Sequence, residues 1–270
     1  MEKIGSLLNQ EYGVDLRSFR IGDAGDVGVG LSLEEAHREL TGVVHGALKG
    51  GAVPFVIGGG NDQSYANASA LLSLLGTGEN AVVCNVDAHL DVRPLKKGAA
   101  HSGSPFRQLL EDKRFKESGS MFCEFAAQGS QCSGEHVQFV RERSGKVVFL
   151  AEMRPPNKTV GELFGAVVSE MQASHLFLSF DLDAVASCDA PAVSCPAVVG
   201  LSADEAQTIM RIAGEQTHLR LVDLSEFSPA VASPNEAYRT GRLVAMMFYY
   251  LLLGMARARG YTLGCQEPPC

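Results

Sequence analysis

The chain has 270 residues, of which 46% are hydrophobic and 20% charged, and its formal net charge is −8. These proportions are those of an ordinary globular protein, so they exclude disordered, collagen-like and coiled-coil classes. An acidic chain without a basic cluster is not expected to bind nucleic acid or an anionic membrane surface. We expect a single domain over residues 1–270.

Neither a targeting segment nor a disulfide framework is expected from the sequence. Residues 1–10 lack the apolar core of a signal peptide, and the apolar run 243–256 is shorter than the roughly 20 residues that span a bilayer. The seven cysteines include no CxxC pair, which argues against structural disulfides and a thiolate zinc site. Cys188 and Cys195 fit ordinary thiols, with redox or metal contact as the alternative. We therefore expect a cytoplasmic protein.

Apolar, β-branched segments alternate along the chain with segments of helical pattern. Capping boxes at Ser32 and Ser202 open two predicted helices, over residues 32–48 and 202–214, and residues 235–256 form a predicted closing helix. Strands that are apolar on both faces favour a mostly parallel sheet covered on both sides, which is a three-layer α/β architecture. The predicted strands span residues 54–57, 81–86, 122–127, 146–150, 176–180 and 219–224. The segments without a clear assignment are residues 1–30, which are glycine-rich, and 260–270, a predicted tail.

Acidic residues follow two of the predicted strands. Asp87, His89 and Asp91 come after the second strand, and Asp181 and Asp183 come after the fifth. Ligands of α/β sheets bind at the carboxyl ends of strands, and alternate residues of an extended chain point to one side. We therefore expect these side chains to converge. Four carboxylates and one imidazole suit Mn²⁺ better than structural zinc, and bridging carboxylates can hold two ions about 3.5–4 Å apart.

Polar residues near other strand ends leave two interpretations open. Residues 58–60 are glycines that fit a strand-to-helix turn or a binding loop, but no Gly-Lys-Ser/Thr follows them, so they are not a phosphate loop. Glu226 fits a surface carboxylate as well as a ligand contact, and His101 fits a solvated loop histidine as well as a catalytic one.

The two aspartate motifs and several other segments together resemble the ureohydrolase family, which includes arginases, agmatinases and formimidoylglutamases. The resemblance covers about residues 53–252. Within the family, GGGND, Arg93 and the SGSPFR loop are most similar to formimidoylglutamases, including the protozoan ones. The matching segments are VDAHLDVR, SFDLDAVASCDAPAVSCPA, PFVIGGGNDQS, HSGSPFR, DLSEFSP and RTGRLVA.

The resemblance implies a centre of two Mn²⁺ ions per subunit on an arginase-like αβα fold. Asp87 and Asp181 would bridge the ions, and His89 and Asp183 would complete one site. Asp91 would bind the other ion and hydrogen-bond the hydroxide between the metals. In this reading that hydroxide attacks the amidine carbon of the substrate.

The resemblance also implies roles outside the metal ligands. His101 would shuttle a proton, and Glu226 would pair with a cationic amidinium or guanidinium and stabilise the tetrahedral intermediate. Arg93 and Arg107 are candidates for the carboxylates of the substrate. The family further implies a homo-oligomer, either a trimer or a hexamer.

Two departures from the family pattern bear on these expectations. Asn61 stands where the family usually has a histidine ligand, and since an amide oxygen binds Mn²⁺ weakly, we expect one metal site to be weak. The family's opening strand is not found before Glu35, which leaves a sheet edge and part of the pocket wall open to question.

The resulting hypothesis is Mn²⁺-dependent hydrolysis of N-formimidoyl-L-glutamate to L-glutamate and formamide. One alternative is a guanidine hydrolase that acts on arginine, agmatine or a guanidino acid and releases urea. Another is a non-catalytic protein with a degenerate metal site, which Asn61 and the missing strand would explain. A phosphoesterase is disfavoured because no basic phosphate clamp lies near the motifs.

Overall fold

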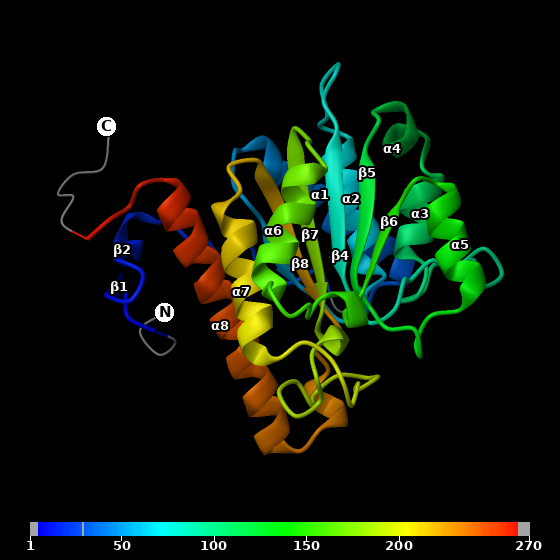
Figure 1. Cartoon of the computed structure of the whole chain (residues 1–270). Coiled ribbons are helices and arrows are strands. Elements are labelled where there is room, and N and C mark those ends of the chain that lie inside the picture. Colours follow the sequence, from blue (N-terminus) through cyan, green and yellow to red (C-terminus); the bar gives the residue numbers. More distant parts are fainter. Residues whose placement is uncertain (1–4, 29, 264–270) are drawn as a thin grey trace.

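The computed structural model of the chain describes residues 5–28 and 30–263. Its centre is a six-stranded sheet of order β3-β8-β7-β4-β5-β6 in which every neighbouring pair is parallel (Figure 1). All six strands were predicted, with ends that differ by one residue at most. The strands are β3 (Phe55–Ile57), β4 (Ala81–Val86), β5 (Met121–Ala127), β6 (Lys146–Phe149), β7 (His175–Asp181) and β8 (Leu219–Ser225).

Helices cover both faces of the sheet, which confirms the predicted three-layer architecture (Figure 1). One apolar cluster joins the sheet to α6 (Val160–Glu170), α7 (Ala203–Glu215) and α8 (Pro234–Ala258). A second cluster lies on the other face. It includes residues of α1 (Leu33–Lys49), α2 (Gln63–Leu72), α3 (Pro105–Glu111), α4 (Lys113–Glu117) and α5 (Gly134–Glu142).

Capping boxes start the helices that the sequence predicted. The Ser32 and Ser202 hydroxyls accept from the backbone of Glu35 and Glu205, and Ser233 caps α8 in the same way. Helices α2 to α6 were not predicted. In α2 eight of ten residues are buried, so it lacks the one-sided apolar pattern by which a surface helix is recognised.

The ends of the described chain pack against α8. Strands β1 (Leu8–Asn9) and β2 (Val14–Asp15) form a hairpin, and the 3₁₀ helix η1 (Leu16–Ser18) follows it. The Asp15 amide donates to the Tyr261 carbonyl at 3.0 Å, and the Leu263 amide donates to the Gly13 carbonyl at 2.9 Å. Residues 261–263 are thus paired with the hairpin, and residues 264–270 of the predicted tail lie outside the described residues.

Strand β3 lies at one edge of the sheet. Within residues 5–28 and 30–263 it pairs only with β8, and its Ile57 side chain is exposed. This agrees with the expectation that no opening strand covers this edge. None of the described helices is long and apolar enough to cross a membrane.

Candidate metal centre and active site

Strands β3, β8, β7 and β4 are neighbours in the sheet, and each is followed by a candidate site residue. Because the strands are parallel, their carboxyl ends meet at one edge. This edge brings together segments that are up to 165 residues apart in the chain, as in the hydrogen bond between Asn61 and Glu226.

The two aspartate motifs share one local structure. The Asp87 carboxylate accepts a hydrogen bond from the His89 amide at 2.7 Å, and Asp181 accepts one from the Asp183 amide at 2.9 Å. Asp91 has a left-handed φ of 44°. The residues therefore converge through tight turns, and the extended chain assumed from the sequence is wrong, although the predicted convergence is found.

Four carboxylates and one imidazole lie together at this edge. Asp87, Asp91 and Asp181 each place an oxygen within 4.8 Å of the others. The His89 ring bridges the two motifs, with Nδ1 at 3.3 Å from Asp87 and 3.2 Å from Asp183. The four aspartates are at most 7% exposed. The structure thus brings together five of the six residues predicted as metal ligands.

This cluster carries more negative charge than its surroundings neutralise. Burial and the neighbouring carboxylates raise the pKa of Asp91 and Asp181 well above the usual range, and they raise the pKa of Asp183 to about 7. Hydrogen bonds to Asp183 and Asp87 raise the pKa of His89 to about 12. The buried Asp183 Oδ1 has no hydrogen-bond partner. Divalent cations would neutralise the cluster, and its oxygen-rich donor set fits Mn²⁺.

Asn61 also reaches the cluster, but its amide nitrogen faces the carboxylates. Nδ2 donates to Asp87 at 3.3 Å and to Asp91 at 3.2 Å, while Oδ1 accepts from the Ser64 hydroxyl at 2.7 Å. In this orientation the side chain is a hydrogen-bond donor to two of the candidate metal-binding carboxylates. Its oxygen, the atom that would bind Mn²⁺, is engaged by α2.

Glu226 stands at the end of β8 with a left-handed φ of 64°. Its carboxylate accepts from the backbone N–H of Asn61 at 3.2 Å and from the Ser194 hydroxyl at 2.6 Å. Glu226 lies close enough to the aspartate cluster for its negative charge to contribute, after burial and the other aspartates, to the raised pKa of Asp181. A half-exposed carboxylate beside the metal cluster is suited to a cationic group.

Arg93 and His101 lie at the two ends of one loop. The Arg93 amide donates to the Gly103 carbonyl at 2.8 Å, and the Arg93 guanidinium lies 3.8 Å from Asp91. Both ring nitrogens of His101 are hydrogen-bonded inside the loop, Nε2 to the Pro94 carbonyl at 3.0 Å and Nδ1 to the Gly103 amide at 3.2 Å. Because Nδ1 accepts, the ring in this arrangement is the neutral Nε2–H tautomer.

Comparisons with known proteins agree with this architecture. A model described as "Arginase family" matches residues 1–254. The chain belongs to the arginase family. Formimidoylglutamase of Ralstonia nicotianae is 30% identical over 87% of this chain and 72% of its own. The crystal structure of Trypanosoma cruzi formiminoglutamase with Mn²⁺₂ is 43% identical, with a TM-score of 0.85 over 94% of this chain and 82% of its own. An asparagine-to-histidine variant of that protein has also been solved with Mn²⁺₂, and it has a TM-score of 0.84.

In this arginase-family chain the Arg107 guanidinium is occupied by structural contacts. It pairs with Glu111 at 3.3 Å, donates to the Val92 carbonyl at 3.4 Å and lies 4.3 Å from the centre of the Phe139 ring. These contacts fasten α3 to the segment that carries Asp91. They give no support to the predicted role of Arg107 in substrate binding, which stays a prediction.

Sequence reasoning missed two buried polar residues of the sheet, Asn85 and Glu124, which are hydrogen-bonded to each other and connect to Asp87. Asn85 donates to Asp87 at 3.3 Å and to both oxygens of Glu124 at 3.2 Å, and all three side chains are fully buried. Asn85 and Glu124 interrupt apolar strands. A polar residue inside a buried strand is the signal that could have found them, because burial requires a partner.

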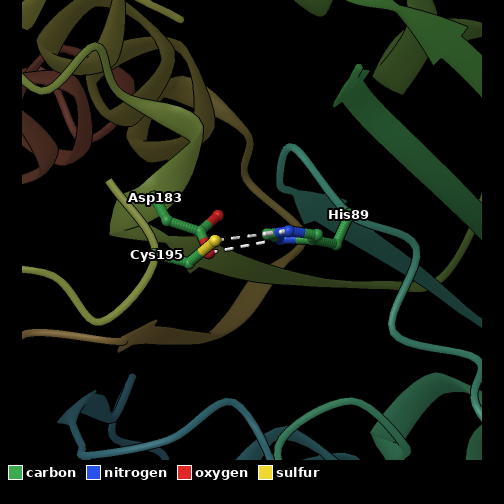
Figure 2. A group of neighbouring side chains, drawn as sticks. All are labelled: His89, Asp183 and Cys195. Atoms are coloured by element: carbon green, nitrogen blue, oxygen red, sulfur yellow. Dashed lines mark hydrogen bonds and ion pairs between the residues drawn. The ribbon is translucent and has the colours of Figure 1, made fainter. Parts of the chain in front are cut away.

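The role of Cys195 was also left open by the sequence. Its exposed thiol lies 3.9 Å from His89 Nε2 (Figure 2), whereas Asp87 contacts Nδ1 of the same ring. Asp183 approaches the same ring, so three different donor types meet there. Cys188 is exposed as well, and its backbone carbonyl accepts a hydrogen bond from Arg239 at 2.9 Å.

Proposed function

We propose that the protein catalyses the Mn²⁺-dependent hydrolysis of N-formimidoyl-L-glutamate to L-glutamate and formamide. The observation that carries this proposal is the buried cluster of four aspartates and His89, which lies beside Glu226 at one sheet edge. Support for the substrate comes from the relatives named formimidoylglutamase or formiminoglutamase, one of them solved with Mn²⁺₂.

The chain's own residues define where manganese would be held. Asp87, Asp181, His89 and Asp183 would supply ligand atoms, and Asp91 would supply a further carboxylate. Bound manganese would supply Lewis acidity and a water nucleophile that is active at neutral pH. The amide contacts of Asn61 and Asn85 to Asp87 hold that carboxylate in place.

The reacting group is held by charge. N-formimidoyl-L-glutamate carries a cationic amidinium, and Glu226 presents a carboxylate oriented by the Ser194 hydroxyl at 2.6 Å. This carboxylate would bind the amidinium so that its carbon faces the metal cluster. It would also stabilise the positive charge that returns to the nitrogens when the tetrahedral intermediate is protonated and its C–N bond breaks.

His101 is the proposed proton donor to the leaving nitrogen. In the described conformation its Nε2–H is held by the Pro94 carbonyl. Proton transfer therefore requires the ring to exchange that carbonyl for the substrate. The glutamate product is better expelled as a neutral amine, so a donor beside the leaving nitrogen accelerates this step.

Arg93 is the proposed partner of a substrate carboxylate. Its guanidinium is half exposed and stands 3.8 Å from Asp91, at the outer side of the centre. A forked guanidinium recognises a carboxylate through two parallel hydrogen bonds. This contact would favour a dicarboxylic substrate over agmatine, which has no carboxylate.

A guanidine hydrolase is the second candidate, because Glu226 would bind a guanidinium as well as an amidinium. Incubation of the Mn²⁺-loaded protein with N-formimidoyl-L-glutamate, L-arginine and agmatine in turn separates the two. We expect glutamate and formamide from the first substrate and no urea from the others. Urea release without glutamate release would overturn the proposed substrate.

The non-catalytic alternative is favoured by one observation, the orientation of the Asn61 amide away from a ligand role. It predicts no turnover of any of the three substrates and fewer than two Mn²⁺ ions per chain at saturation. The cytoplasmic location and the trimeric or hexameric assembly stay predictions.

A further inference from the structure

His89, Asp183 and Cys195 form a group with one nitrogen, one oxygen and one sulfur donor. The thiol lies 3.9 Å from His89 Nε2, and Asp183 Oδ2 lies 3.2 Å from His89 Nδ1 (Figure 2). We propose that this group binds a soft divalent cation of the zinc and cadmium class at a site that Cys195 completes and that shares His89 and Asp183 with the proposed manganese centre. The proposal concerns the thiol, which no role in the amidine hydrolysis uses.

The donor spacing fits a tetrahedral ion of this class. Ligands of zinc lie about 2.0–2.3 Å from the metal, which places neighbouring donors about 3.3–3.8 Å apart. Here one donor atom from each residue lies within 4.8 Å of the other two. The donor atoms therefore need to approach one another by about 1 Å to hold one ion. Cys195 is an exposed loop residue that has room for this movement.

The donor chemistry selects the cation. A thiolate prefers soft cations such as Zn²⁺ and Cd²⁺, whereas Mn²⁺ prefers carboxylate, carbonyl and water oxygens. Binding releases to solvent the protons held by the ligating atoms of Cys195, His89 and Asp183 and forms metal–sulfur, metal–nitrogen and metal–oxygen bonds, with no change in oxidation state. Thiolate, carboxylate and neutral imidazole then leave a divalent ion fully neutralised.

Occupation of this site has a consequence for the proposed enzyme. His89 and Asp183 are also proposed manganese ligands, so a soft cation held by Cys195 would remove both from the manganese centre. This consequence rests on the proposed function, whereas the binding itself does not. We therefore expect Zn²⁺ or Cd²⁺ to release one Mn²⁺ ion and to inhibit the protein through Cys195.

The test is a Cd²⁺ titration that follows the ultraviolet charge-transfer band of the cadmium–thiolate bond. The full-length chain carries Cys265→Ser and Cys270→Ser, so that the terminal thiols contribute no band, and it is stripped of metal first. Cys84 and Cys123 are fully buried. We expect one Cd²⁺ per chain with a thiolate band that is lost in Cys195→Ser.

Cys188→Ser is the matched control, because Cys188 is an exposed thiol on the same loop. It should keep the band and the affinity, while His89→Ala should weaken the affinity for Cd²⁺ at least about tenfold. A band that survives Cys195→Ser, or an affinity unchanged in His89→Ala, would overturn the site. Neither readout depends on turnover.

The manganese consequence is measured separately by the electron paramagnetic resonance signal of free Mn²⁺. Cd²⁺ added to the Mn²⁺-loaded chain should release one Mn²⁺ ion, and Cys195→Ser should require at least about tenfold more Cd²⁺ for the same release. Equal release from both would show that Cd²⁺ replaces manganese directly and would overturn the inhibitory role. The cadmium–thiolate band and the release of Mn²⁺ are both measured without substrate. They therefore test the site even if the chain hydrolyses none of the substrates.

Discussion

The Ser64 hydroxyl donates to Asn61 Oδ1 at 2.7 Å and thereby sets the direction of the Asn61 amide. Ser64 is itself 3.1 Å from the Ser179 hydroxyl, and both are fully buried. With its oxygen held by α2, Asn61 turns Nδ2 toward Asp87 and Asp91. This residue therefore orders the carboxylates without competing for a metal.

Asn61→His should tighten the weaker of the two manganese sites. An imidazole nitrogen is a strong ligand for divalent ions, whereas the amide it replaces offers only N–H donors to the cluster. We expect the dissociation constant of the second Mn²⁺ to fall at least about tenfold. Titration followed by electron paramagnetic resonance of free Mn²⁺ measures this.

The same titration on Ser64→Ala shows whether the Ser64 hydroxyl determines the orientation of the Asn61 side-chain amide. Losing the donor frees Asn61 Oδ1 to turn, so the affinity for Mn²⁺ should change in this variant. Ser69→Ala on the same helix, which contacts Arg114 instead, should not alter it. An Asn61→His variant with unchanged metal binding would contradict the assigned position of Asn61.

Glu124 should act as a neutral acid that holds Asn85. Burial raises the pKa of Glu124 well above its usual range, which favours the protonated form that glutamine mimics. We expect Glu124→Gln to keep its Mn²⁺ affinity within about threefold and Glu124→Ala to lose about tenfold. Equal losses in both variants, measured by Mn²⁺ titration, would show that the charge of Glu124 matters instead.

Gly103 makes room for Arg93. A Cβ at Gly103 would lie 1.9 Å from Arg93 Nε and 2.1 Å from its Cζ, so any side chain there displaces the guanidinium. We expect Gly103→Ala to raise KM for N-formimidoyl-L-glutamate about tenfold, the cost of one charge-assisted contact, with little change in kcat.

Two further variants complete this test. Gly103→Ala should add nothing in an Arg93→Ala background, because the contact is already absent. Gly134→Ala, where a Cβ meets nothing within 4 Å, should leave KM unchanged. Additive effects of Gly103→Ala and Arg93→Ala would indicate that the glycine acts by another route.

The metal-free protein should lose stability as the pH rises from 5 to 8. The folded pKa of Asp183, about 7, lies above its usual value of 3.8. Its stabilising contribution is therefore complete below pH 3.8 and is lost as the pH rises through 7. The pKa of His89 is raised from 6.5 to about 12, so its stabilising contribution also falls as the pH rises above 6.5.

Urea unfolding of the metal-free chain at pH 5 and pH 8 measures this effect. For Asp183 alone, the loss in the free energy of unfolding between pH 5 and pH 8 is about 3 kcal/mol, because only the interval from pH 5 to its folded pKa of about 7 contributes. Mn²⁺ should restore more stability at pH 8 than at pH 5, since protons compete for the same oxygens. A metal-free protein that is more stable at pH 8 would contradict the described charge cluster.

The parts of the site that the sequence predicts are those with strong local signals. Asp87, His89, Asp181 and Asp183 follow apolar strands at fixed spacing, so their meeting follows from the parallel sheet. The turns that orient these side chains were not predictable from strand periodicity. Each turn depends on an aspartate carboxylate that accepts a hydrogen bond from the backbone N–H of the residue two positions later.

Long-range contacts account for most of what the sequence did not reveal. Asn85 and Glu124 lie outside the quoted motifs, and Ser64 and Ser194 lie within motifs that assigned them no role. Each acquires its role from a partner that is known only from the folded structure. Helix α2 is buried nearly all round and so shows no amphipathic pattern. Arg107 was predicted from charge alone, and the contact with Phe139 that occupies it depends on how α5 packs.

Glutamate release from N-formimidoyl-L-glutamate, followed as Mn²⁺ is titrated into metal-stripped protein, tests the central claim most directly. We expect release that rises with Mn²⁺, saturates, and disappears in Asp181→Ala, since Asp181 is the proposed bridging carboxylate. Asp204→Ala, which removes a carboxylate outside the predicted ligand set in the first turn of α7, should titrate like the unmodified chain. Absence of glutamate at saturating Mn²⁺, or full activity in Asp181→Ala, would contradict the proposed function.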